Sequence, residues 1–261
     1  MTKIKKYVVF DLDETLGCFV ELGILYDSLH RMYGVKLTSN HFNRLLDVYP
    51  EFLRPNILNI LNFVKRMKKR GKCEKVIIYT NNQGPSSWAK LIMEYFHYKL
   101  DYDLFDQIVG AYMVNGRVVE VGRSSDNKLY KDLVRCVNLT EDARICFLDD
   151  QYHEGMKHSN VCYINVKPYK QYIPLGEIAN RYYENFNPKV DKSIFINMLI
   201  SSMSIFSLRI VVLEEMERNV DTIIGKKMLE HVKDFFVKKQ NKTKKRKYDN
   251  KNNKNNKSKK T

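Results

Sequence analysis

Residues 8–16 read VVFDLDETL. A short apolar run ends there in two aspartates, Asp11 and Asp13, with one leucine between them. Near-continuous apolar runs are typical of parallel strands that are covered on both faces. We therefore expect a buried strand over residues 7–10, with both acids at its carboxyl end.

Three further apolar runs have the same character, and segments with helical spacing lie between them. We expect these strands over residues 76–79, 145–148 and 161–166. Helices are predicted over residues 55–70, after Ser86 and after Asp126, which could cap the last of them. Strands that alternate with helices predict an α/β fold with a doubly wound parallel sheet.

Two small insertions interrupt this alternation. Residues 17–52 separate the first strand from the next helix and carry leucines at helical spacing. Asn115 and Gly116 lie between two apolar dipeptides, which predicts a two-residue β-hairpin within residues 112–119. We expect both insertions to overhang the ends of the strands, near the functional site.

The chain divides by composition into three parts. Residues 1–174 hold the alternating pattern, and residues 175–237 are predicted to form a helical appendage packed on the core rather than a free-standing module. Residues 238–261 contain almost only Lys, Asn and other polar residues, so they cannot bury apolar surface and should be disordered.

Most of the net charge of +15 lies in this last part. Residues 238–261 contain twelve Lys or Arg and one Asp, which leaves 15 − 11 = +4 for the rest of the chain. The cluster at residues 244–247 resembles a nuclear-localisation signal, and a polycation also attracts nucleic acid by releasing counterions. A solvated extension with no further role is an equal alternative.

The cysteines and the apolar segments indicate an intracellular protein, nuclear or cytoplasmic. Five scattered cysteines without a C-x-x-C pair predict neither a disulfide framework nor a zinc site. The apolar segment at residues 194–208 contains Asn197 and four serines, and it is shorter than the roughly 20 residues of a membrane span. We expect no membrane association, and the sequence specifies no oligomeric state.

Polar clusters follow three of the predicted strands. Because ligands of open α/β sheets bind at the carboxyl ends of strands, we expect these clusters to meet in one crevice. Carboxylates packed together raise one another's pKa unless a cation neutralises them, and Mg²⁺ prefers such oxygen ligands. The clusters contain, in chain order, Asp11 and Asp13, Thr80 and Asn81, and Asp149 and Asp150.

The same residues resemble the four motifs of the haloacid-dehalogenase-like superfamily. Residues 8–16 look like its motif I, which is the most specific of the four. Thr80, Lys131 and the pair Asp149 and Asp150 look like motifs II, III and IV, in that order. The resemblance implies a Rossmann-like phosphatase domain.

Within the superfamily, the chain resembles the NLI-interacting-factor-like branch, the phosphatases of the RNA polymerase II C-terminal domain. Leu-Arg-Pro at residues 53–55 and Lys-Asp-Leu at residues 131–133 carry this likeness, which covers about residues 4–170. The Lys-Asp-Leu match favours Lys131 as the motif III lysine over Lys128, which lies one turn earlier.

The resemblance implies a role for each catalytic residue. Asp11 is the nucleophile that forms an aspartyl-phosphate, and Asp13 protonates the leaving oxygen and then activates water. Thr80 holds a phosphoryl oxygen, with Asn81 beside it in the substrate-binding set. Lys131 neutralises charge on the transferred group.

The resemblance also implies a Mg²⁺ site. Its expected ligands are the carboxylates of Asp11 and Asp150 and the backbone carbonyl of Asp13, with Asp149 nearby. A hard divalent ion held by carboxylates, waters and substrate phosphate is the usual form of such a site.

We expect the substrate to be a phosphoserine or phosphothreonine monoester in a protein. The motif II string Thr80 to Gln83 departs from the branch and is similar to polynucleotide 3′-phosphatases of the superfamily, which is the alternative. A weakly catalytic scaffolding protein is the third possibility. Arg123 is interpreted as a surface residue, and His153 is assigned no role.

Overall fold

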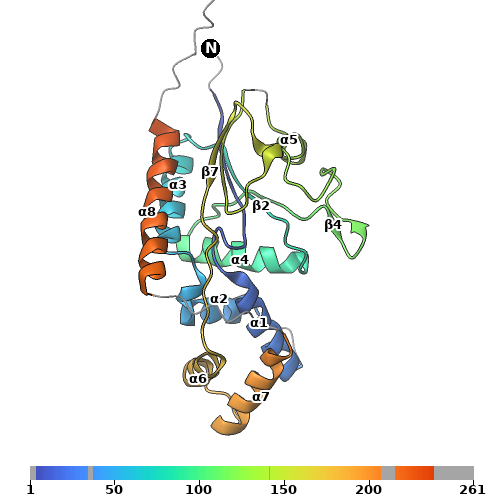
Figure 1. Ribbon diagram of the computed structural model, residues 1–261, viewed down its shortest axis with the longest axis vertical. Coiled ribbons are helices and arrows are strands. Elements are labelled where there is room, and N and C mark those ends of the chain that lie inside the picture. The colour runs from blue at the N-terminus through green and yellow to red at the C-terminus, as the bar shows by residue number, and fades with distance from the viewer. Residues whose placement is uncertain (1–3, 35–37, 141, 207–214, 238–261) are drawn as a thin grey trace, which may run out of the picture.

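The computed structural model describes residues 4–34, 38–140, 142–206 and 215–237. The predicted disordered tail, and the part of the expected last helices within residues 207–214, lie outside the described residues. The described chain forms a five-stranded parallel sheet in the order β3-β2-β1-β6-β7 (Figure 1). Its strands are β1 (Lys6–Phe10), β2 (Lys75–Tyr79), β3 (Gln107–Val109), β6 (Arg144–Asp149) and β7 (Val161–Asn165).

The strand order reverses once, at β1. From β1 the chain proceeds to β2 and β3 on one side, and it then returns to place β6 and β7 on the other. The α/β class and the parallel sheet predicted from the apolar runs are therefore confirmed. Ligands of such sheets bind at this reversal, which here lies between β1 and β6.

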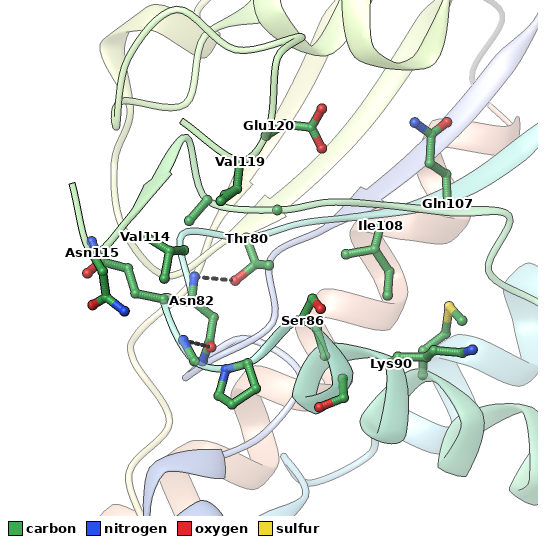
Figure 2. A pocket seen from close by; sticks show the side chains of 18 of the residues that line it. Thr80, Asn82, Ser86, Lys90, Gln107, Ile108, Val114, Asn115, Val119 and Glu120 are labelled. Carbon is green, nitrogen blue, oxygen red and sulfur yellow. Dashed lines mark hydrogen bonds between the residues drawn. The ribbon is translucent and has the colours of Figure 1, made fainter. Parts of the chain in front are cut away.

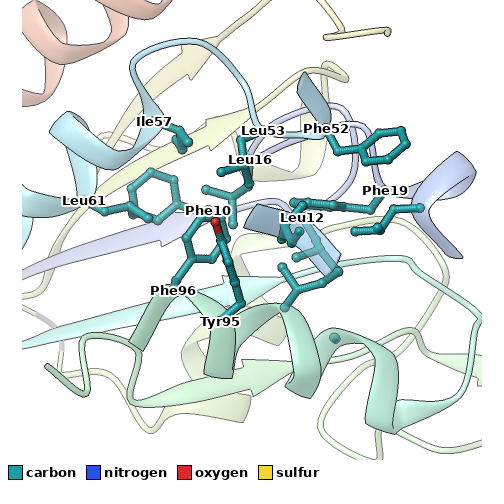
Figure 3. Close-up of a cluster of buried hydrophobic side chains, with 14 of the residues drawn as sticks. Phe10, Leu12, Leu16, Phe19, Phe52, Leu53, Ile57, Leu61, Tyr95 and Phe96 are labelled. Carbon is teal, nitrogen blue, oxygen red and sulfur yellow. The ribbon is translucent and has the colours of Figure 1, made fainter. Parts of the chain in front are cut away.

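Helices cover both faces of the sheet, but unequally. Side chains that alternate along the strands belong to two separate buried clusters, one on each face. Of the α-helices described, only α5 (Tyr130–Val137) contributes residues to the smaller cluster, to which the 3₁₀ turn Glu154–Met156 adds Met156. The larger cluster, part of which is drawn in Figure 3, includes α1 (Phe19–Tyr33), α2 (Ser39–Val48), α3 (Ile57–Lys69), α4 (Ser86–Leu100), α6 (Leu175–Phe186), α7 (Lys192–Ser204) and α8 (Glu215–Val237).

The helices after residue 174 are built into the larger cluster. Tyr182 of α6 stacks on Phe195 of α7, with ring centroids 5.4 Å apart, and both are buried. Met228 and Val232 of α8 are buried in the same cluster. The described residues of α6, α7 and α8 therefore share one buried cluster with the sheet.

Helix α8 lies alongside α3 and ends beside the beginning of β1 (Figure 1). The Lys6 ammonium donates hydrogen bonds to the backbone carbonyls of Phe235 at 2.8 Å and Phe236 at 3.2 Å. It also lies over both phenyl rings. The carbonyls in the last turn of a helix lack hydrogen-bond donors within the helix and carry partial negative charge. The Lys6 ammonium supplies a donor to two of them, and its positive charge is attracted to that negative charge.

The predicted hairpin is present. It joins β4 (Met113–Val114) to β5 (Arg117–Val118) in antiparallel pairing. Asn115 has φ of 50° and Gly116 has φ of 74°, so both turn residues occupy the left-handed region that a type I′ turn requires.

One expected helix start was wrong, and one strand was missed. Asp126 does not cap a helix, because α5 begins at Tyr130 after Leu129, which is extended. Strand β3 was not predicted, since its three residues are too few to show an apolar run. Among the described residues, no helix combines the length and the apolar character needed to cross a membrane.

Candidate active site

The predicted polar clusters meet in one pocket at the carboxyl edge of the sheet. Asp11 follows β1 and Thr80 follows β2, while Asp149 ends β6. The Asp11 N–H donates to the Leu148 carbonyl at 2.9 Å, which continues the pairing of β1 with β6. The pocket has a volume of about 260 Å³, and its lining includes Asp11, Asp13, Thr80, Asn81, Asn82, Lys128, Asp149, Asp150 and His153.

Lys128, and not Lys131, is the lysine of this pocket. Its ammonium lies 2.5 Å from Asp11 Oδ1 and 2.6 Å from Asp149 Oδ2, and its side chain is only 2% exposed. Lys131 is exposed on α5 and is not among the residues that line the pocket. The prediction failed because Lys128 precedes α5, so helical spacing does not relate its direction to that of Lys131.

Three carboxylates are arranged to share a cation. One oxygen from each of Asp11, Asp149 and Asp150 lies within 4.8 Å of the others. The Thr15 hydroxyl orients Asp150: it donates to the Asp150 carboxylate and accepts from the Asp150 N–H, both at 3.0 Å. His153, to which no role was assigned, places Nε2 3.5 Å from Asp149 Oδ2.

Asn82 orients Asp13 toward the pocket. The Asn82 amide donates to Asp13 Oδ2 at 2.7 Å, and Asp13 Oδ1 is buried without a hydrogen-bond partner among the described residues. The Thr80 hydroxyl in turn accepts from the Asn82 N–H at 3.0 Å. An unpaired buried oxygen is costly unless a ligand or water satisfies it, so Asp13 Oδ1 still requires a hydrogen-bond donor.

Arg123 is buried, which corrects its interpretation as a surface residue. It is 3% exposed and donates to the carbonyls of Thr80 at 3.1 Å and Gly110 at 2.7 Å. It also donates to Asn81 Oδ1 at 2.8 Å. The Asn81 side chain thus lines the pocket while its oxygen is held by Arg123, which fixes the loop after β2.

A second buried arginine holds the loop after β1. Arg54 is 1% exposed and donates to the backbone carbonyls of Thr15 at 2.7 Å and Lys167 at 2.8 Å, and also to that of Glu14. Glu14 has φ of 56°, an uncommon conformation for a residue with a side chain. Arg54 therefore supports the tight turn that follows Asp13 and joins it to the segment after β7.

The electrostatics of the pocket favour a proton or a cation. Burial raises the pKa of Asp13 to about 6, with the charge of Asp11 adding to the effect and the Asn82 hydrogen bond opposing it. Burial and the charge of Asp11 likewise raise the pKa of Asp150 to about 6.

Lys128 compensates only part of this charge. Burial raises the pKa of Asp11, although Lys128 opposes the shift. Burial also acts to raise the pKa of Asp149, but hydrogen bonds from His153 and Lys128, together with the Lys128 charge, lower it overall. One buried ammonium thus faces several carboxylates, which leaves the pocket with excess negative charge.

The structure brings together every predicted site residue except Lys131, and it adds Lys128 and Asn82. The Lys-Asp-Leu match was the sequence signal that distinguished the two lysines, and it favoured Lys131 rather than Lys128. Asn82 was visible only as part of the motif II string that departs from the resembling branch. Comparison of the chain with protein-family models, with curated proteins and with solved structures finds no match.

Proposed function

We propose that this protein is a Mg²⁺-dependent phosphomonoesterase of the haloacid-dehalogenase-like type, related to the NLI-interacting-factor-like branch. The observation that carries the proposal is the pairing of two aspartates with different environments in one pocket. Asp11 contacts the buried Lys128 ammonium, whereas Asp13 presents an unpaired oxygen among the described residues. A nucleophile and a separate acid–base group require such a difference.

In the proposed reaction, Asp11 attacks the phosphorus atom and its oxygen forms a new bond there. The bond from phosphorus to the leaving oxygen breaks, and Asp13 donates a proton to that oxygen. Burial raises the pKa of Asp13 to about 6, so more of it is protonated near neutral pH than of an ordinary aspartate. The Thr80 hydroxyl and the Lys128 ammonium are placed to stabilise the phosphoryl oxygens.

The second half of the reaction releases phosphate. Asp13, now ionised, takes a proton from water as the water oxygen attacks the aspartyl-phosphate. The bond between phosphorus and the Asp11 oxygen then breaks, which frees inorganic phosphate and regenerates the Asp11 carboxylate.

The carboxylates of Asp11, Asp149 and Asp150 fit a magnesium ion. All three offer oxygen ligands within 4.8 Å of one another, and the charge that Lys128 leaves uncompensated suits a divalent cation. Together with the Asp13 backbone carbonyl, they would hold the ion beside the phosphoryl position. Bound there, Mg²⁺ polarises a phosphoryl oxygen and neutralises negative charge.

The substrate we propose is a phosphoserine or phosphothreonine of a protein. A nucleic-acid 3′-phosphate is a second candidate, because a cavity of about 390 Å³ that adjoins Asp13 is lined by Tyr26 and Trp88. Aromatic rings of this kind can stack on bases. However, Trp88 packs edge-on against Phe42 within the core, with centroids 5.4 Å apart, which favours a structural role for its ring.

A comparison of three substrates tests the proposal. With Mg²⁺ present, we expect phosphate release from p-nitrophenyl phosphate and from a phosphoserine peptide, and at least about tenfold less from a 3′-phosphorylated oligonucleotide. The reverse preference would support the nucleic-acid reading. A protein that bound phosphopeptide but released no phosphate from any of the three would be a scaffolding protein instead.

Magnesium and pH should have linked effects on stability. In EDTA, the free energy of unfolding should fall as pH rises from about 4 through 6, since Asp13 and Asp150 bind protons more tightly in the folded state, with a pKa of about 6. Above pH 6 the buried carboxylates are ionised, and their burial and mutual repulsion lower the free energy of unfolding in full. There, Mg²⁺ at 100 times its dissociation constant should raise the free energy of unfolding by about 2.7 kcal/mol. Thermal unfolding at pH 5 and 7.5, with and without Mg²⁺, measures both effects.

The matched variant for this experiment is Asp150→Asn. It should be less sensitive to pH in EDTA and should lose most of the Mg²⁺ stabilisation at pH 7.5. An equal Mg²⁺ effect at pH 5 and 7.5 in the unsubstituted protein would contradict a site made of these carboxylates.

A further inference from the structure

A wide cavity lies along the outer edge of β3. It has a volume of about 1000 Å³ and is bordered by the loop at residues 82–87, the start of α4, β3 and the β4–β5 hairpin. Figure 2 shows the strand with Gln107 and Ile108 passing between Ser86 and Lys90 on one side and Glu120 on the other. The cavity is therefore a groove with a strand edge as its floor.

The outer edge of β3 is open to pairing. Within the described part of the chain, β3 pairs with β2 and is the last strand of the sheet on that side. Gln107 and Ile108 are partly exposed. An uncovered strand edge presents backbone N–H and C=O groups that a further extended strand can satisfy.

The groove shares two lining residues with the candidate active site. Thr80 and Asn82 line both the groove and the pocket that contains Asp11. Since both lie at the carboxyl end of the parallel strands, a chain paired along β3 would reach the pocket at one of its ends.

The charges of the groove argue against a polyanion. Its lining contains Asp106 and Glu120 but only one cationic residue, Lys90. Asp106 is paired with Lys68 at 2.9 Å and Lys90 with Glu94 at 3.8 Å, whereas Glu120 has no ion pair among the residues described. A nucleic-acid backbone would be repelled there, and a basic side chain would be attracted.

We propose that an extended segment of a phosphoprotein substrate pairs with the outer edge of β3. The segment carries a Lys or Arg that approaches Glu120, and it places the adjacent phosphorylated residue in the pocket at Thr80. This inference rests on the proposed function for the fate of the phosphate, but the binding mode itself does not require turnover.

Binding of a non-hydrolysable peptide tests the inference independently of catalysis. The probes are fluorescein-labelled peptides with a phosphonate analogue of phosphoserine and a five-residue flank, which contains Lys, on either its amino or its carboxyl side. With Mg²⁺ present, anisotropy should show at least about tenfold tighter binding for one flank than for the analogue alone. The amino-side flank indicates parallel pairing, and the carboxyl-side flank indicates antiparallel pairing.

Backbone methylation distinguishes strand pairing from side-chain contact. N-methylation removes an N–H donor, and only alternate residues of a paired strand direct their N–H toward β3. We expect methylation at alternate positions to weaken binding about fivefold to tenfold, and methylation at the positions between them to change it less than twofold. Equal sensitivity at all positions, or at none, would overturn the inference.

A charge exchange tests the Glu120 contact. Glu120→Lys should weaken binding of the Lys-containing peptide about tenfold, and changing the peptide Lys to Glu should restore it. The control is Glu74→Lys, an exposed site at the opposite end of β2, where no change is expected. If phosphate release fails while these patterns hold, the proposed reaction is wrong and the binding mode stands.

Discussion

Asp11→Asn is expected to lower kcat for p-nitrophenyl phosphate at least about 10³-fold, because an amide oxygen cannot replace the carboxylate as a nucleophile. The variant should fold, since asparagine still offers an oxygen to Lys128, and the substitution removes one of several buried negative charges. Steady-state kinetics with Mg²⁺, together with thermal unfolding, measure the loss of activity and the retained fold.

The matched control is Asp103→Asn. Its carboxylate is 94% exposed and lies on the loop after α4, away from the pocket lining. We expect its kcat to remain within twofold of that of the unsubstituted protein. Full turnover by Asp11→Asn, with the fold intact, would falsify the aspartyl-phosphate mechanism.

The second large effect is expected at Lys128. Lys128→Met should reduce kcat/KM at least about 100-fold, since it removes the buried ammonium that contacts the proposed nucleophile, Asp11. It should also destabilise the protein by about 3–5 kcal/mol without Mg²⁺, because the carboxylates of Asp11 and Asp149 are then buried without their cation. Chemical denaturation in EDTA measures this loss.

Lys131→Met is the matched control for that experiment, because Lys131 lies only three residues further along the chain. Its exposed side chain predicts an activity within twofold and a stability within about 0.5 kcal/mol of the unsubstituted protein. Added Mg²⁺ should recover part of the stability of Lys128→Met but not its activity. The opposite ranking of the two variants would return the catalytic lysine to the position predicted from the Lys-Asp-Leu match.

The sheet was predictable because its strands are buried on both faces. Residues 7–10 and 145–148 are apolar at successive positions, which is the pattern that two buried faces impose. Strand β3 did not show this pattern, because it is short and forms an edge. The convergence of Asp11, Thr80 and Asp149 followed from topology alone, since the carboxyl ends of parallel strands lie at one edge.

The sequence did not indicate in the same way which side chains of the connecting segments point into the interior. Lys128 and Lys131 differ by one turn if both are helical, and only the start of α5 at Tyr130 separates them. Arg123 is buried, and its two terminal guanidinium nitrogens donate five hydrogen bonds to carbonyl and amide oxygens. Three of these acceptors belong to Thr80, Asn81 and Gly110, which are distant in the sequence, so local residue type gives no indication of them.

The hydrogen bonds from Lys6 to the end of α8 fix the position of that helix end relative to the candidate active site. Lys6 begins β1, whereas Asp11 directly follows it, so the two are separated by roughly 16 Å of extended chain. The last turn of α8 therefore lies near the amino end of β1, whereas the pocket lies at the carboxyl ends of the strands. An affinity matrix or a fluorescent dye attached after Val237 by a short linker would leave the mouth of the pocket accessible, so the immobilised protein is suited to direct measurement of substrate capture.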